Sequence, residues 1–303
     1  MTQMKQVYIV AVSGGVDSVV LLHKIVASSK SQSSISNPQS PIYIVAHFDH
    51  GIRPDSANDA KFVERLAKSY GLAFVSKRVE MGVGASEESA RNARYEFLIS
   101  VMKKHSAEAV ITAHHQDDVL ETMIVNMLRG TGPRGLIGFS RPSLLRPLLD
   151  KPKIELLNYA KTNNLEWRED STNLDMTYIR NYVRHEIVPK LSSSQRQKLI
   201  EIRNREVGLC AEIDDQAKKL LVQTLEKGEL VRSRFVVLPY LLQKELIAVW
   251  LRLNGVELDR KMIERAVLSA KTLSPNKTVE LTSKVTLRTT KNTIVLNVDL
   301  AHV

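Results

Sequence analysis

The stretch YIVAVSGGVDSVVLLHKI, residues 8–25, joins an apolar strand-like run to an apolar helix-like run through a short polar turn with two glycines. A glycine pair lets the backbone approach a ligand closely, and the first amides of the following helix lack partners within that helix. Because the positive end of the helix dipole lies at the same point, the turn predicts an anion-binding site.

The side chains of this turn suit a phosphate accompanied by Mg²⁺, since they combine two small hydroxyls, two glycine amides and one carboxylate. The residues expected to bind the nucleotide here, with Asp17 as the metal ligand, are Ser13, Gly14, Gly15, Val16, Asp17 and Ser18. The turn lacks the lysine of the Walker loop and the third glycine of the dinucleotide-binding fingerprint. A plain turn with a helix cap is the alternative interpretation.

Apolar strand-like runs alternate with amphipathic segments through the first half of the chain. These runs occupy residues 7–12, 42–48, 73–79 and 109–113. The alternation predicts β-α-β units and a Rossmann-like parallel sheet with helices on both faces, an α/β fold. The serine-rich residues 28–41 show no periodicity and predict a surface loop.

After Leu191 the alternating pattern ends, and a long charged pattern typical of a helix runs from Ser194 to about Lys227. One more helical stretch and two or three short strands follow it. The domains expected are a catalytic domain, a helical linker and a small α/β C-terminal domain, at residues 1–191, 192–227 and 228–303.

Composition narrows the class of protein. With 303 residues, 43% of them hydrophobic and 25% charged, the chain is typical of soluble globular proteins of about two domains. The single cysteine, Cys210, excludes an internal disulfide framework. No apolar run of about 18 residues and no signal-peptide pattern is evident, so we expect a cytoplasmic protein without membrane contact. The net charge of +10 favours a polyanionic partner.

Polar clusters follow the second and fourth strand-like runs as well as the first. Ligands of parallel sheets bind beyond the carboxyl ends of the strands, so the three clusters should share one crevice. The second cluster contains His47, Asp49 and His50. The third contains His114, His115, Asp117, Asp118 and Glu121. Helix-dipole stabilisation explains one of these carboxylates, but not two histidines with three carboxylates.

Arginines gather in three further segments. Glu87, Arg91 and Arg94 fall on one helix face. The common alternative to a functional role for them is a series of solvent-exposed ion pairs along that face. The other two segments are a glycine-rich loop and a short helical run, and their arginines are Arg129, Arg134, Arg141, Arg146, Arg180 and Arg184. Arginines on a glycine-rich loop suit phosphate contacts with RNA, whereas a bare surface loop is the alternative.

The SGGVDS turn after an N-terminal strand resembles the PP-loop of the N-type ATP pyrophosphatases. Within that superfamily, further stretches resemble the tRNA(Ile)-lysidine synthetases. These stretches are HFDHGIRPDSANDAKFV, SEESARNARYEFL, TAHHQDDVLETMIVNMLRGTGPRGLIGF, RPLLDKPKIELLNYA and WREDSTNLDMTYIRNYVRHEIVPKL. Together they cover most of residues 8–191.

The resemblance implies an ATP-dependent carbon–nitrogen ligase that joins L-lysine to the wobble cytidine of a tRNA(Ile) with a CAU anticodon. ATP would adenylate the C2 oxygen of the base, releasing pyrophosphate, and the lysine amine would then displace AMP. The cofactors implied are ATP and Mg²⁺, and the C-terminal domain would bind the tRNA. A homodimer is left open.

The resemblance also implies roles for the clusters. His47, Asp49 and His50 would lie beside the adenosine and Mg²⁺, and Asp118 and Glu121 would recognise the lysine ammonium. Arg94 would grip the phosphates or the activated base, and Arg180 or Arg184 would reach the α-phosphate. The remaining substrate-binding residues expected are Arg91, His114, His115, Asp117, Arg129 and Arg134.

Four other functions are weighed against this one. The common tRNA thiolases use a cysteine pair, and this sequence holds only Cys210. Amidotransferase relatives need an ammonia source, and the second residue is Thr2 rather than a glutaminase nucleophile. A two-metal phosphohydrolase would use HFDH and HHQDD as ligands, and it leaves SGGVDS unexplained. Non-enzymatic RNA binding is supported by charge alone.

Overall fold

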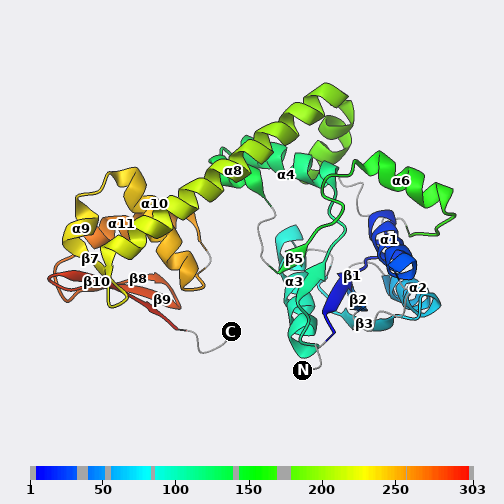
Figure 1. Cartoon of the computed structure of the whole chain (residues 1–303), viewed down its shortest axis with the longest axis horizontal. Coiled ribbons are helices and arrows are strands. Elements are labelled where there is room, and N and C mark those ends of the chain that lie inside the picture. Colours follow the sequence, from blue (N-terminus) through cyan, green and yellow to red (C-terminus); the bar gives the residue numbers. More distant parts are fainter. Residues whose placement is uncertain are drawn as a thin grey trace. The chain divides into compact units, whose positions relative to one another are not determined.

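The structure is a computed structural model that describes residues 5–32, 40–51, 56–82, 86–138, 143–168, 179–256 and 258–299. The chain divides into two compact units, Met1–Ile202 and Arg203–Val303. Figure 1 labels the helices and strands of both.

A five-stranded parallel sheet forms the centre of the first unit, in the order β3-β2-β1-β4-β5. Its strands are β1 (Val7–Ala11), β2 (Ile42–Asp49), β3 (Ala73–Arg78), β4 (Ala109–Ile111) and β5 (Leu144–Leu145). The expected parallel sheet is therefore confirmed. Because β1 lies between β2 and β4, the polar segments after these three strands leave the same edge of the sheet.

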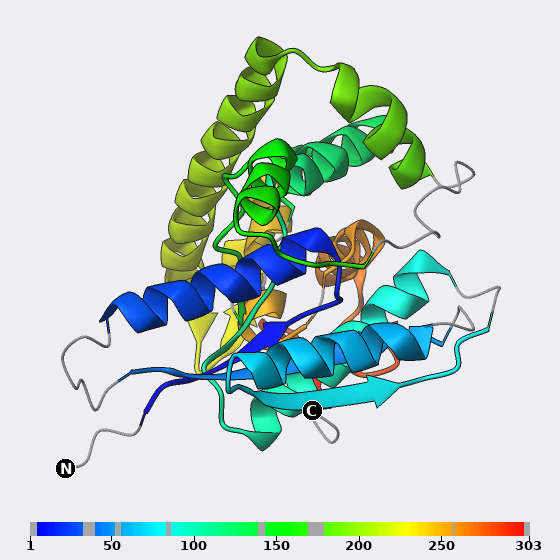
Figure 2. The same ribbon diagram turned by 90° about the vertical axis from the view of Figure 1, so that its right-hand side faces the viewer.

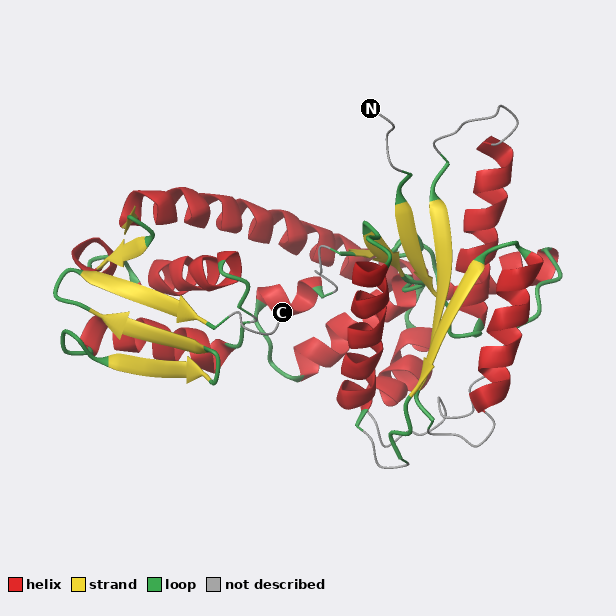
Figure 3. Cartoon of the chain, turned by 90° about the horizontal axis from the view of Figure 1, so that it is seen from below, coloured by secondary structure: helices red, strands yellow, loops and turns green. Residues whose placement is uncertain are grey.

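Helices cover both faces of this sheet, as Figures 2 and 3 show. Successive side chains of a strand point to opposite faces, and Ile9 and Val10 of β1 are both fully buried. Val10 packs with α1 (Val16–Gln32), α2 (Ser56–Ser69) and α6 (Lys153–Thr162), whereas Ile9 packs with α3 (Glu87–Lys104). The expected Rossmann-like arrangement is confirmed.

A separate cluster anchors α4 (Gln116–Leu128), the helix that follows β4. Leu120 and Ile124 of α4 pack against Val183 and Val188. These two valines belong to a short helical run made of α7 (Ile179–Tyr182), a π-helical turn (Val183–Ile187) and a 3₁₀ turn (Val188–Lys190). The short helix α5 (Pro133–Ile137) follows α4 in the chain. This packing brings the arginines near residue 180 to the first turns of α4.

The long helix α8 (Ser193–Thr224) leads into the second unit. That unit has a five-stranded antiparallel sheet in the order β6-β7-β10-β9-β8. Its elements are β6 (Leu225–Glu226), β7 (Glu229–Val231), α9 (Arg232–Val236), α10 (Tyr240–Leu253), α11 (Arg260–Thr272), β8 (Thr278–Thr282), β9 (Val285–Thr289) and β10 (Thr293–Val298). Its core includes Phe235, Leu246, Trp250 and Ile294.

The structure corrects the expected serine-rich loop at its start, because α1 continues to Gln32. The hydroxyls of Ser28 and Ser29 donate to the carbonyls of Lys24 and Ile25, one helical turn earlier. These bonds let serine stay within a helix. Residues 33–39 of that stretch lie outside the described part of the chain.

Several elements carry too weak a signal to be predicted. They are the two-residue strands β5 and β6, the three-residue strand β7 and the five-residue helix α9. The helix α11 was missed although it is amphipathic and Asp259 caps its start. The long helix also ends at Thr224 rather than near Lys227, since Leu225 and Glu226 pair with β7. Within the described residues, we find no helix with the length and apolar character needed to cross a bilayer.

Candidate active site

The turn between β1 and α1 presents its polar groups in a compact set. The amide of Gly14 donates to Ser18 Oγ over 3.2 Å, and the amide of Gly15 donates to Ser13 Oγ over 3.4 Å. Gly14 has a φ of +99°, which a residue with a side chain rarely adopts. Val16, the first residue of α1, follows directly. Two amides and two hydroxyls therefore converge where an anion would be held.

Asp17, in the first turn of α1, is held by a lysine that the sequence analysis missed. Lys153 Nζ lies 2.6 Å from both carboxylate oxygens of Asp17. Burial raises the pKa of Asp17, but His115 and Lys153 outweigh it and keep this pKa below its usual value. Asp17 is therefore an anion at neutral pH. Lys153 begins α6, and a lone lysine at a helix start carries no sequence signal for such a contact.

His115 connects the first and third polar clusters. Its Nε2 lies 3.5 Å from Asp17 Oδ2 and 3.5 Å from Asp118 Oδ2. Burial lowers the pKa of His115, but the two carboxylates outweigh burial and raise it. The backbone amide of His115 donates to Asp118 Oδ2 over 2.9 Å, which caps α4. The expected meeting of these two clusters is thus seen in the structure.

Asp117 lies in the same turn and has structural partners. It accepts the backbone amide of Lys153 at 3.0 Å and Arg196 Nη1 at 2.9 Å. These bonds fasten the starts of α6 and α8 to α4. Arg196 was not among the residues expected at the site, because it lies far along the chain in a segment with a helical charge pattern.

Glu121 is 2% exposed and is bound by an arginine fork. Arg184 donates from Nε to Oε1 and from Nη2 to Oε2, both over 2.8 Å. Burial raises the pKa of Glu121, and Arg184 opposes this shift. Arg180 lies close by, with Nε 3.8 Å from Glu121 Oε2 and Nη2 donating to Thr122 Oγ1. Both arginines thus face the carboxylates of α4.

A second group of arginines lies around His114. Arg91 and Arg94 of α3 each lie 5.5 Å from the ring centre of Tyr95. The pKa of His114 is lowered to about 4, mainly by burial; Asp118 opposes this shift, and the charges of Arg94, Arg146 and Arg91 add to it. Burial also lowers the pKa of Arg94. The side chain of Glu87 lies outside the described part of the structure, so the series of ion pairs along α3 stays a prediction.

The neutral state of His114 predicts a pH dependence of stability. The folded protein keeps His114 unprotonated down to about pH 4, whereas the unfolded chain takes up this proton near pH 6.5. The contribution of neutral His114 to the free energy of unfolding is complete above pH 6.5. As the pH falls below this value, the contribution decreases by about 1.4 kcal/mol per pH unit. Asparagine at this position would not take up a proton. Between pH 7 and pH 4.5 we therefore expect the free energy of unfolding to fall by about 2–3 kcal/mol less in His114→Asn than in wild type.

Urea unfolding at the two pH values measures this difference. His105→Asn serves as the control, because it makes the same substitution at another histidine of the first unit, the C-cap of α3. Equal losses of unfolding free energy in wild type and His114→Asn would contradict the neutral buried state.

The cluster after β2 is fixed by its own neighbours. His47 Nδ1 bonds the carbonyl of Val12 over 2.8 Å, which ties the end of β2 to the end of β1. Asp49 Oδ2 accepts Arg78 Nη1 over 3.0 Å. Burial raises the pKa of Asp49, but Gly51, Ser56 and Arg78 outweigh it, so the group is anionic. Arg78 was missed, although it is the direct neighbour of Asp49 in the β2–β3 register. His50 packs edge-on against Phe48.

Of the arginines of the glycine-rich loop, Arg146 acts on His114, whereas Arg129 and Arg134 lie at the end of α4 and in α5. Arg129 caps the C-terminal end of α4, a helix of 13 residues. At about 1.5 Å per residue, that end lies roughly 20 Å from the carboxylates of the first turn. Arg134 lies in α5, which Asn126 fastens through a bond to the carbonyl of Gly135. Arg141 lies outside the described residues.

The possible metal ligands are few. Among the described residues, no group of three or more histidine, cysteine, aspartate or glutamate side chains is arranged to hold a metal ion. Asp17 is anionic, partly exposed and next to the anion-binding turn, with a side-chain exposure of 27%. One carboxylate of this kind suits Mg²⁺ that is bound mainly through phosphate oxygens and water.

Comparison with known proteins identifies the family. Residues 2–191 match the family described as PP-loop domain. The chain is 38% identical over 226 residues to a tRNA(Ile)-lysidine synthase of Deinococcus deserti, covering 73% of this chain and 40% of that protein. It is 35% identical over 264 residues to a tRNA(Ile)-lysidine synthase of Nitrosomonas europaea, covering 78% of this chain and 55% of that protein. The chain thus spans about half the length of these relatives or less.

Among solved structures, the tRNA thiolase NcsA from Methanococcus maripaludis is similar in fold. The TM-score is 0.56 at 18% sequence identity, and the match covers 67% of this chain and 71% of that one. The matched family covers the sheet, the glycine turn and the carboxylates of α4. The chain therefore belongs to the PP-loop domain family.

Proposed function

We propose that this chain is an ATP-dependent ligase that joins L-lysine to the wobble cytidine of a tRNA(Ile) with a CAU anticodon. The observation that carries the proposal is the joint placement of an anion-binding turn and two carboxylates, Asp118 and Glu121, at one edge of the sheet. His115 links them, since its ring lies 3.5 Å from both Asp17 and Asp118. The names of the relatives, tRNA(Ile)-lysidine synthases, support the substrate.

In the first step, the turn would hold the phosphates of ATP while the C2 oxygen of cytidine attacks the α-phosphorus. The amides of Gly14 and Gly15 and the hydroxyls of Ser13 and Ser18 would bind the departing pyrophosphate. Their present partners are one another, and hydroxyls can rotate towards a stronger acceptor. Lys153 would move from Asp17 to a phosphate oxygen and offset its charge. His47, Asp49 and His50 would border the adenosine.

Mg²⁺ would be held by Asp17 together with the phosphates of ATP. The ion would neutralise negative charge on the phosphates and orient them. The two oxygens of Asp17 can accept the ion once Lys153 has turned towards the nucleotide.

In the second step, the lysine amine would attack C2, the bond between C2 and the former O2 would break, and AMP would leave carrying that oxygen. Asp118 and Glu121 would hold the incoming ammonium by opposite charge. The attacking amine must first lose a proton, and the raised pKa of Glu121 suits this carboxylate to accept it. Arg184 would then pass from Glu121 to the α-phosphate, with Arg94 and Arg180 as further partners of the adenylated base. Arg91, His114 and Asp117 would border the same substrates.

Parts of the chain outside the reaction centre would bind the tRNA. We assign catalysis to residues 1–191, a linker to residues 192–227 and tRNA binding to residues 228–303. The net charge of +10 suits an RNA partner. Arg129, at the C-terminal end of α4, and Arg134, in the helix α5 that packs beside α4, would contact phosphates of the RNA rather than the reacting base.

This last assignment gives a prediction for Arg134→Ala. Removing one phosphate contact should flatten the plot of log affinity for tRNA against log salt by about 0.7–0.9 units, and affinity should fall at low salt. Fluorescence anisotropy of labelled tRNA measures both, with the exposed Lys104→Ala as control. An unchanged slope in Arg134→Ala would place this residue outside the RNA interface.

Mass analysis of nucleosides tests the reaction itself. A tRNA(Ile) with a CAU anticodon is incubated with the protein, ATP and lysine, digested and analysed. We expect a cytidine heavier by one lysine less one water. Unmodified cytidine, with tRNA and ATP both shown to bind, would overturn the proposed function.

A further inference from the structure

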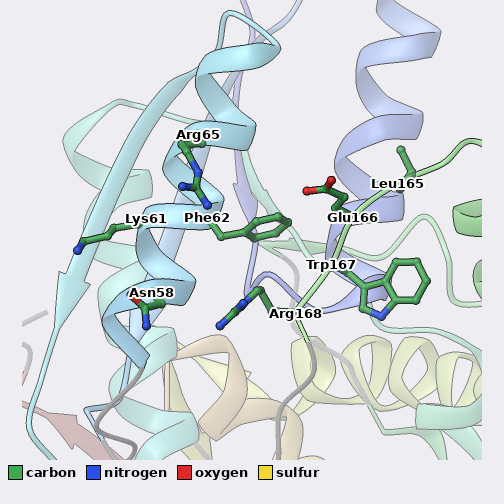
Figure 4. A pocket seen from close by; sticks show the side chains of 8 residues that line it. All are labelled: Asn58, Lys61, Phe62, Arg65, Leu165, Glu166, Trp167 and Arg168. Carbon is green, nitrogen blue, oxygen red and sulfur yellow. The ribbon is translucent and has the colours of Figure 1, made fainter.

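A pocket of about 590 Å³ lies against the back of the glycine turn, outside the proposed reaction centre. Its walls are α2 and the segment that follows α6. The residues that line it are Asn58, Lys61, Phe62, Arg65, Leu165, Glu166, Trp167 and Arg168. Figure 4 shows Phe62 reaching from α2 towards the facing segment, from which Arg168 points back towards α2.

The pocket is built into the phosphate-binding turn. The amide of Arg168 donates to the carbonyl of Gly14 over 2.9 Å. A Cβ atom added at Gly14 would lie 3.6 Å from Phe62 and 3.5 Å from Val63. Arg168 is also fastened to α2, since its Nε donates to Asp59 Oδ1 over 3.1 Å. A ligand in the pocket would therefore lie next to the ATP-binding turn.

The charge of the lining is positive. The lining contains three cations, Lys61, Arg65 and Arg168, and one carboxylate, Glu166. Within the described parts of the chain, neither Lys61 nor Arg65 makes an ion pair, although Lys68 on the same helix pairs with Glu64 over 2.8 Å. Two unpaired cations one turn apart on α2 thus border the pocket.

The combination of long cationic side chains with a half-buried aromatic ring points to a particular ligand. Phosphates of nucleic acids are positioned by exposed lysine and arginine side chains, and unpaired bases stack on aromatic rings. A free nucleotide would use the backbone amides of the turn instead. The volume is also within the range of about 300–1,000 Å³ that holds small ligands.

The geometry points to a binding site for one unpaired nucleotide of the RNA substrate in this pocket. Its phosphate lies beside Arg65, with Lys61 one turn away on α2 (Figure 4) adding positive charge, and its base lies against Phe62. This inference rests on the proposed function for the identity of the RNA. It adds a contact that holds the anticodon strand beside the turn while an adjacent base enters the crevice.

The test compares two double variants of the full chain. Lys61→Ala with Arg65→Ala removes the pocket cations, and Lys103→Ala with Lys104→Ala removes the same charge from exposed positions in the last turn of α3. The ligand is a labelled 17-nucleotide anticodon stem-loop with the CAU sequence. We expect the pocket variant to bind it roughly tenfold more weakly and with a flatter salt dependence, and the control to differ little. ATP binding, measured separately, should be unchanged in both.

A second readout distinguishes RNA from ATP as the occupant. The chain has two tryptophans, Trp167 in the pocket wall and Trp250 in the core of the second unit. In a Trp250→Phe chain the emission therefore reports on Trp167 alone. We expect the stem-loop to change this emission and ATP to leave it unchanged.

Equal RNA affinities in the pocket and control variants would overturn the proposed nucleotide site. An emission change caused by ATP but not by the stem-loop would also overturn it. The proposed function would survive either result, provided that the wild-type protein still forms the modified cytidine. If wild type binds the stem-loop at the pocket but forms no product, the proposed function fails and the pocket stands.

Discussion

Asp17→Asn is expected to lower the ATP-to-AMP turnover that depends on tRNA and lysine by about 10²–10³-fold, the loss typical of removing one preorganised charged group. The substitution keeps the shape of the side chain but removes the charge that faces Lys153 and His115. Asparagine would present only one oxygen, and its amide would face the lysine ammonium. Both the positioning of Lys153 and the proposed holding of Mg²⁺ would be lost.

The measurement is release of labelled AMP, with binding of tRNA followed separately by anisotropy. Asp150→Asn is the matched control, since it makes the same change at a carboxylate with 74% side-chain exposure in the same unit. RNA binding should be retained in both variants. Wild-type turnover in Asp17→Asn would contradict the assignment of the turn to ATP.

Glu121→Gln is expected to have two separable effects. It leaves Arg184 without its carboxylate, which for a buried pair lowers the free energy of unfolding by about 3–5 kcal/mol. Because the side chain of Arg184 is 33% exposed and can turn to water, we expect a loss of about 2 kcal/mol. It should also raise the KM for lysine much more than the KM for ATP, since the ammonium loses one of its two carboxylates.

Urea unfolding and steady-state kinetics measure these effects, and a second substitution separates them. Glu121→Gln with Arg184→Met removes the unpaired charge and should recover most of the lost stability. The KM for lysine should stay high. Glu186→Gln is the control, since it makes the same substitution in a solvent-exposed pair, with Lys190, whose loss should change stability little. Equal increases of both KM values in Glu121→Gln would remove its role in lysine binding.

Lys153 and Arg184 pair with the carboxylates that are expected to bind Mg²⁺ and the lysine ammonium. Each candidate carboxylate is bound by a cation of the chain itself, Asp17 by Lys153 and Glu121 by Arg184. In the proposed reaction these cations exchange their carboxylates for phosphate oxygens as the substrates arrive. The carboxylates then become available for Mg²⁺ and for the lysine ammonium. The site thus balances its buried charges with and without substrates.

Much of the architecture follows from local sequence. The runs at Val7 and Ile42 are rich in β-branched residues, and the pair Gly14–Gly15 between a strand and a helix marks the turn. Residues that follow strands of one parallel sheet must share an edge, so the meeting of the Asp17 and His115 clusters could be predicted. The strand β5 could not, because two residues carry little signal. The helix α11 could have been predicted, since Asp259 caps its start and apolar residues recur at helical spacing.

The amino-acid sequence by itself determined the parallel sheet, the anion-binding turn and the edge at which the polar clusters gather, because these depend on patterns that span a few residues. Only the tertiary structure decided which charges meet. Lys153 lies 136 residues from Asp17, and Arg184 lies 63 residues from Glu121. Pairs so distant along the chain are brought together by the packing of α6 on α1 and of residues 179–190 on α4. The periodicity of a sequence predicts which face of a helix is buried, but it does not predict which charged residue of another element will lie against that face.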